Sequence, residues 1–65
     1  MNQSELAKRT GYSRFMISRI LAGKRDASKV GAIRLERAVL GTKLLDWLFA
    51  SKNFKRLAKI VRSTE

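Results

Sequence analysis

The stretch QSELAKRTGYSRFMISRILAGKR, residues 3–25, contains two short helical patterns on either side of Gly11. Both segments have helical periodicity, and no segment of the chain alternates between apolar and polar residues as a strand would. A glycine can adopt the left-handed conformation that ends a helix, and Ser13 is a preferred N-cap for the next one. The stretch therefore predicts a helix over 3–9, a tight turn, and a second helix that ends near residue 22.

Three more helical segments follow this stretch. We expect a third helix over 29–40, capped by Ser28, a fourth that is capped by Thr42 and runs to about residue 50, and a basic amphipathic helix over 53–62. The third helix has apolar side chains in two sectors, so we expect it to be buried on two sides. The first sector holds Val30, Ile33 and Leu40, and the second holds Ala32, Leu35 and Val39.

Composition limits the class of protein. A chain of 65 residues that is 45% hydrophobic fits one small domain rather than a disordered basic tail. Cysteine and histidine are absent, which removes disulfides and the usual zinc ligands. The five acidic residues are scattered, so we expect no metal, no cofactor and no enzymatic activity. The predicted fold is all-α, a compact bundle of about five short helices in a single domain over 1–65.

The charge of the chain points to its partner. A net charge of +10 and a pI near 11.3 indicate a polyanion, either nucleic acid or an anionic membrane. No apolar run reaches the length of a membrane span, and no signal-peptide pattern opens the chain. We therefore expect a cytoplasmic protein without a membrane partner.

One aromatic residue falls on the charged side of the second predicted helix. Ile17, Ile20 and Leu21 share one side of that helix. Phe15 lies on the opposite side, together with Arg14, Ser18 and Arg19. An aromatic ring among charged and polar side chains indicates a contact surface rather than a core position.

Residues 3–25 resemble the bacterial and phage repressors of the Cro and lambda-repressor type, also called the xenobiotic-response-element type. The family's Gln–x–x–x–Ala–x–x–x–Gly–x–x–x–x–x–Ile–Ser pattern lies at Gln3, Ala7, Gly11, Ile17 and Ser18. The Gly-Lys-Arg that follows is also typical, and the resemblance continues more loosely through SKVGAIRLERAVLG. It implies a helix-turn-helix over 2–25 whose second helix enters the major groove of DNA.

The sequence departs from this family in two ways. Family members usually have a helix before the motif, whereas here the motif begins at the second residue, and Thr10 stands where a larger aliphatic residue is usual. Both departures remove apolar material from one side of the core. We expect the C-terminal helices, residues 41–65, to cover that side.

Helix geometry and the resemblance select the same residues for contacts with bases: Arg14, Phe15, Ser18 and Arg19. Arg14 can bind the O6 and N7 edge of guanine, and Phe15 can contact thymine methyl groups. Alternatively, Phe15 packs against the loop over 23–28 or a neighbouring side chain. Phosphate contacts are expected from residues that flank this face, and the resemblance implies that Gln3 holds a phosphate. They are Gln3, Ser13, Lys24, Arg25, Ser28 and Lys29.

The C-terminal third carries a wide apolar face that fits the core, a two-fold dimer interface, or both. The candidate dimer residues are Leu44, Trp47, Leu48, Phe54 and Leu57. The basic helix over 53–62 fits a dimer arm, a supplementary phosphate contact or a membrane-surface helix.

The resemblance implies a transcriptional regulator. We expect a homodimeric repressor of a phage or mobile-element operon, which represses its own operon by binding an inverted-repeat operator in double-stranded DNA. It would need no small-molecule ligand and would act at the nucleoid, in the cytoplasm of a bacterial host. The alternatives are an architectural or excisionase-like DNA-binding protein and a cationic membrane-binding helix protein.

Overall fold

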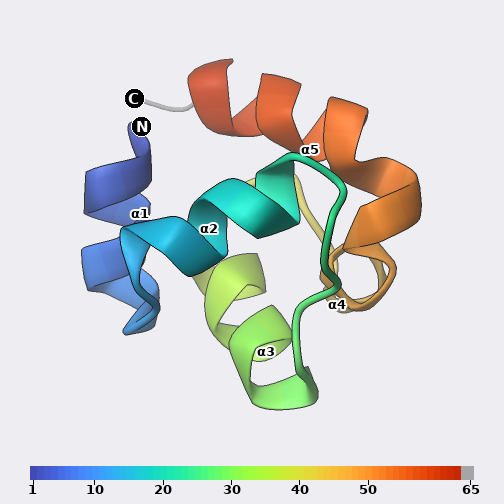
Figure 1. Cartoon of the computed structure of the whole chain (residues 1–65), viewed down its shortest axis with the longest axis horizontal. Coiled ribbons are helices and arrows are strands. Elements are labelled where there is room, and N and C mark those ends of the chain that lie inside the picture. The colour runs from blue at the N-terminus through green and yellow to red at the C-terminus, as the bar shows by residue number, and fades with distance from the viewer. Residues whose placement is uncertain (64–65) are drawn as a thin grey trace.

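The computed structural model describes residues 1–63, which form five helices and no strand (Figure 1). The helices are α1 (Gln3–Thr10), α2 (Arg14–Leu21), α3 (Lys29–Ala38), α4 (Leu44–Leu48) and α5 (Ala50–Ser63). They enclose one apolar core, and the Cα radius of gyration is 9.8 Å. The predicted all-α bundle of short helices is confirmed.

Local hydrogen bonds set the limits of α1 and α2. Asn2 caps α1, because its side-chain oxygen accepts the N–H of Glu5 at 2.8 Å. Gly11 ends this helix in the left-handed conformation, with φ of 78°. Ser13 caps α2, because its Oγ accepts the N–H of Met16 at 3.1 Å. The predicted sequence of helix, tight turn and helix is therefore confirmed.

The core lies where α2 meets its neighbours. The helix packs against α1 and α5, while α3 packs against α1 and α4. The largest fully buried apolar side chains come from all five helices: Leu6, Ile17, Ile20, Leu35, Trp47 and Leu57. The helix α5 lies beside α2 and covers this side of the core, and the Met1 ammonium donates to the carbonyl oxygen of Val61 at 3.2 Å.

The predicted burial of α3 on two sides is wrong. Val30 is 60% exposed, Leu40 is 80% exposed and Ile33 is half-buried. The neighbours α1 and α4 cover only the sector that holds Ala32 and Leu35, both of which are buried. Apolar side chains on the other sector therefore face outward.

The predicted cap of the fourth helix is also wrong. Thr42 is buried, and its hydroxyl donates to the carbonyl oxygen of Val39 at 2.8 Å while it accepts the indole N–H of Trp47 at 2.9 Å. Lys43 takes the N-cap position, and its backbone N–H donates to the Asp46 carboxylate at 2.9 Å. The threonine hydroxyl thus satisfies a buried tryptophan rather than a helix end.

The C-terminal helices differ from the prediction in length as well. The helix α4 is short because the backbone of Phe49 leaves the helical region, with φ of −116° and ψ of 39°. The next helix, α5, begins directly afterwards at Ala50, three residues before the predicted start. It runs across one side of the molecule, beside α2 (Figure 1).

Candidate functional site

The exposed face of α2 carries all four of the side chains that were predicted to contact bases. Arg14, Phe15, Ser18 and Arg19 are exposed. The opposite face of the helix, with Ile17 and Ile20, is buried, so packing of the core fixes which side of α2 points outward. The structure therefore brings these four residues together on one surface.

Phe15 is 69% exposed, so it is not buried against the loop over 23–28. Its neighbour Arg19 places the guanidinium carbon 5.6 Å from the centre of the ring, which is a cation–π distance. Burying a phenylalanine side chain stabilises a fold by about 1.5–3 kcal/mol, and the exposed ring forgoes most of that gain. The position therefore contributes little to folding and leaves an apolar surface open to a partner.

Two serines and a lysine of the predicted phosphate contacts lie at the starts of helices. Ser13 caps α2, and Ser28 caps α3 by accepting the N–H of Gly31 at 3.3 Å. The hydroxyls of Tyr12 and Ser28 share a hydrogen bond of 3.1 Å, and a Cβ atom at position 31 would overlap the Tyr12 ring. The start of α3, including the exposed Lys29, is thereby fixed beside the turn that precedes α2.

The loop over 23–28 presents Lys24 and Arg25, both exposed, beyond the end of α2. The loop is fixed to the C-terminal helices on both sides of these two residues. Gly23, with φ of 77°, lies so close to Phe54 that a Cβ atom would overlap the ring. The N–H of Ala27 donates to the carbonyl oxygen of Trp47 at 3.1 Å.

Asp26 links the same loop to α5. Its carboxylate accepts the backbone N–H of Ser51 at 2.7 Å, at the start of that helix. This backbone hydrogen bond, with the Ser51 hydroxyl and the charge of Lys52 as smaller causes, lowers the pKa of Asp26 below its ordinary value of 3.8. The carboxylate is therefore held ionised at the helix N-terminus, where negative charge is favourable.

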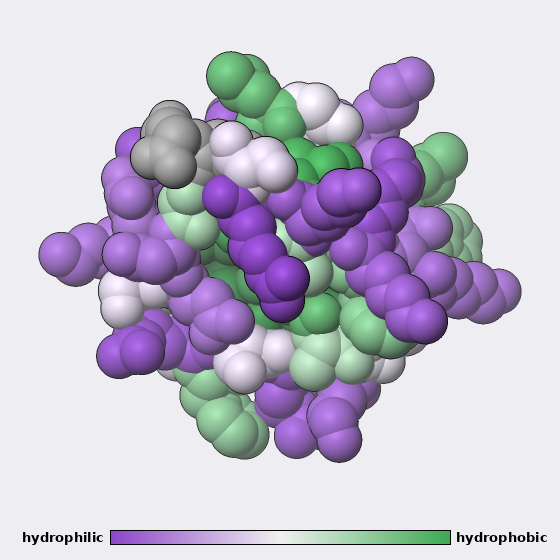
Figure 2. Space-filling model, turned by 90° about the horizontal axis from the view of Figure 1, so that it is seen from above, coloured by the Kyte–Doolittle hydropathy of each residue, from purple (hydrophilic) through white to green (hydrophobic). Residues whose placement is uncertain are grey.

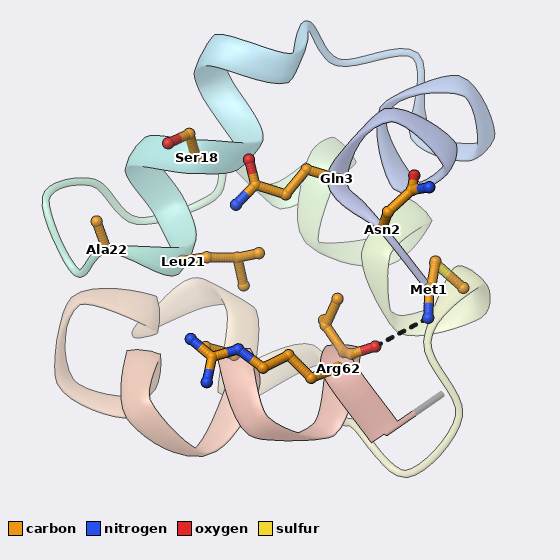
Figure 3. Close-up of a pocket in the computed structure, with 9 residues that line it drawn as sticks. Met1, Asn2, Gln3, Ser18, Leu21, Ala22 and Arg62 are labelled. Atoms are coloured by element: carbon orange, nitrogen blue, oxygen red, sulfur yellow. Dashed lines mark hydrogen bonds between the residues drawn. The ribbon is translucent and has the colours of Figure 1, made fainter. Parts of the chain in front are cut away.

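A groove lies between the start of α1, the second half of α2 and the end of α5 (Figure 3). Gln3 extends from α1 toward α2, and Ser18 and Leu21 line the groove from α2. Arg62 of α5 extends beneath Leu21 from the other side. The predicted phosphate contact at Gln3 thus lies next to a predicted base contact. It also lies next to Arg62, which belongs to the basic helix for which a supplementary phosphate contact was one of three predicted roles.

The structure corrects part of the predicted dimer interface. Trp47 and Leu57 are fully buried in the core of the single chain, so neither can form a surface between two copies. Leu44, Leu48 and Phe54 are half-buried, the last of them against Gly23. The apolar side chains that do reach the surface of the C-terminal third include Leu45 and Phe49, which are four residues apart and belong to the wide apolar face predicted for this part of the chain.

Within residues 1–63, no three acidic side chains come close enough together to hold a metal ion. No helix of this part of the chain is both long enough and apolar enough to cross a membrane. No family model, curated protein or solved structure matches the chain. Its function must therefore be inferred from its own surface.

Proposed function

We propose that the protein is a sequence-specific regulator of transcription that binds double-stranded DNA through the exposed face of α2. The observation that carries the proposal is the exposed Phe15 beside Arg14, Ser18 and Arg19 on a chain with a net charge of +10. The resemblance of residues 3–25 to Cro-type repressors supports the same interpretation. We further propose that it acts as a dimeric repressor of a phage or mobile-element operon, at an inverted-repeat operator.

The chemistry of α2 suits the major groove. That groove is about 12 Å wide and admits one helix, whose diameter with side chains is about 10–12 Å. Arg14 is the first residue of the helix, the part that reaches base edges in helix-turn-helix proteins, and its guanidinium matches the two acceptors of guanine. Phe15 supplies the apolar contact that a thymine methyl group accepts, and Ser18 can donate to or accept from a base.

Phosphate contacts at both ends of α2 would orient the helix. Gln3 and the N-terminal backbone of α1 line the protein groove between α1, α2 and α5, beside Ser18, and a helix N-terminus favours an anion. At the other end, Ser13 and Lys29 flank the turn before α2. Lys24 and Arg25 follow the helix on a loop that is fixed to α5 and therefore has a defined position.

An inverted-repeat operator requires a two-fold dimer with one recognition helix for each half-site. The dimer needs an apolar surface apart from α2. Leu45 and Phe49 of the α4 region are exposed, and the half-buried Leu44 and Leu48 border them in sequence. We propose that this surface, in place of the buried Trp47, joins the two copies.

The test begins with selection of duplexes from a random pool, which reports the half-site sequence and spacing. The selected duplex and a scrambled duplex of the same composition are then titrated at one salt concentration. We expect clear preference for the selected duplex. Arg14→Ala should weaken binding to that duplex by about 5- to 150-fold, equivalent to about 1–3 kcal/mol, and relax the preference at one base pair. Equal affinity of the wild type for both duplexes would contradict sequence-specific binding.

Lys24→Ala is the matched control for this experiment. Because Lys24 is predicted to contact phosphate, its substitution should weaken binding to both duplexes by the same factor. A measurement of the bend angle on the selected duplex separates a repressor from an architectural protein, for which we expect a strong bend and coverage of long DNA.

A further inference from the structure

The exposed face of α5 is uniformly basic. Residues 50–63 contain no acidic residue, and five cations project from the helix: Lys52, Lys55, Arg56, Lys59 and Arg62. The opposite face, with Leu57 and Val61, is buried in the core. A view onto α5 shows hydrophilic side chains over much of this side of the molecule (Figure 2). Since its apolar face is already covered, the folded helix has only charge to offer a partner.

The cations of α5 differ in their partners, and the charge of Lys52 acts on Asp26. Arg56 forms an ion pair with Asp46 of α4. Lys55, Lys59 and Arg62 are spaced by four and three residues, so they share one side of the helix. Together with Leu21 of α2 they line the groove between the two helices. Within residues 1–63 these three, which we call the α5 ridge, have no acidic side chain as an ion-pair partner.

The position of the ridge follows from the packing of α5 against α2. Packed helices lie about 8–10 Å apart, whereas the major groove is about 12 Å wide. A helix packed beside one that occupies the groove cannot enter it as well, so it faces the sugar–phosphate backbone at the groove edge. Arg62 also lines the neighbouring groove that Gln3 lines, so this end of the ridge lies next to the phosphate contact predicted at the start of α1.

We propose that the α5 ridge is a second DNA-contact surface, in which Lys55, Lys59 and Arg62 bind phosphates of the backbone beside the groove that α2 occupies. The proposal rests on the function proposed above, and it assigns α5 the part of holding the duplex without reading its sequence. Each ammonium or guanidinium group that neutralises a phosphate releases counterions, so the ridge should contribute to the salt dependence of binding.

The test compares two variants of the full chain that each lose three positive charges. The ridge variant carries Lys55→Gln, Lys59→Gln and Arg62→Gln. The control variant carries Lys8→Gln, Arg37→Gln and Lys43→Gln, which are exposed residues that do not line either groove beside α2. Glutamine is a good helix former, so both should fold, which circular dichroism verifies.

Affinities for the selected and the scrambled duplex are measured by fluorescence anisotropy over a series of salt concentrations. For the ridge variant we expect the slope of log K against log salt, which is negative, to decrease in magnitude by about 0.9 for each lost contact. The loss of affinity should be equal on both duplexes, with unchanged base preference. The control should change the slope by less than about 0.9, the value for one phosphate contact. Ridge and control variants with the same slope would overturn the proposal.

The outcomes for the two proposals are distinct. If the wild type binds both duplexes equally and the ridge variant still reduces the magnitude of the salt slope, sequence-specific binding is contradicted and the ridge proposal stands. If Arg14→Ala relaxes base preference while the ridge variant matches its control, the ridge fails and the proposed function stands. Binding of the wild type to phosphatidylserine vesicles with no binding to duplex DNA would overturn both.

Discussion

The helices α2 and α5 lie side by side and bury one face each in the same core, but their exposed faces differ. The first exposes a guanidinium group, an aromatic ring and a hydroxyl group, from Arg14, Phe15 and Ser18. The fully exposed side chains of the second are all basic, except for Ser63 at its end. A mixed set of groups can distinguish one base pair from another, whereas a set of cations recognises only charge. Two helices that pack in the same core can thus present one surface suited to base discrimination and one suited to binding phosphates.

The largest effect on stability is expected from a substitution in the buried face of α5. Leu57 of α5 is fully buried, so Leu57→Ala should lower the free energy of unfolding by about 2–5 kcal/mol. Phe15→Ala on α2 removes an exposed side chain and should change it by no more than about 0.5 kcal/mol. Urea unfolding followed by circular dichroism measures both. A large loss of stability for Phe15→Ala would show that the ring belongs to the fold rather than to the surface.

A smaller effect is expected where the end of α2 meets α5. Gly23 and Gly41 both have positive φ, so alanine at either position costs about 1–2 kcal/mol in backbone strain. At position 23 the new methyl group also overlaps Phe54, whereas at position 41 it meets open space. We therefore expect Gly23→Ala to be the more destabilising by about 1–3 kcal/mol in thermal unfolding. Equal losses would mean that Phe54 moves away freely and that the two helices are only loosely joined.

The smallest effect concerns Asp26, the acidic link between the loop after α2 and the start of α5. Its pKa is lowered in the folded chain, so its contribution to stability is complete above the ordinary value of 3.8 and is lost as the pH falls through the lower pKa of the folded state. Asp26→Asn keeps an acceptor for the Ser51 N–H but removes this titration. Melting temperatures measured between about pH 5 and pH 2 should therefore fall less in the variant than in the wild type. Parallel profiles for the two proteins would contradict the link.

The sequence predicts the first two helices well because their limits depend on local chemistry. Gly11 and Ser13 each act through hydrogen bonds or dihedral angles within a few residues, as the structure confirms. The face of α2 that points outward also follows from the spacing of its apolar residues. The four exposed positions of α2, residues 14, 15, 18 and 19, could therefore be predicted without knowledge of the rest of the fold.

The remaining features depend on contacts between distant segments. Thr42 has the sequence character of a helix cap, yet the indole of Trp47 takes its hydroxyl in the core. Periodicity identifies an apolar sector around Val30 but does not say whether another helix covers it. Likewise, the α5 ridge is visible in the sequence as charge, and only the packing of α5 against α2 gives it a place beside the predicted site.

The buried indole of Trp47 has a practical consequence. It is the only tryptophan of the chain, it is fully enclosed, and its N–H donates to Thr42 in the core. Its emission should therefore shift to longer wavelength when the chain unfolds and stay nearly constant when a partner docks on α2. A labelled duplex and this intrinsic fluorophore, measured in the same sample, would separate variants that have unfolded from folded variants that no longer bind DNA.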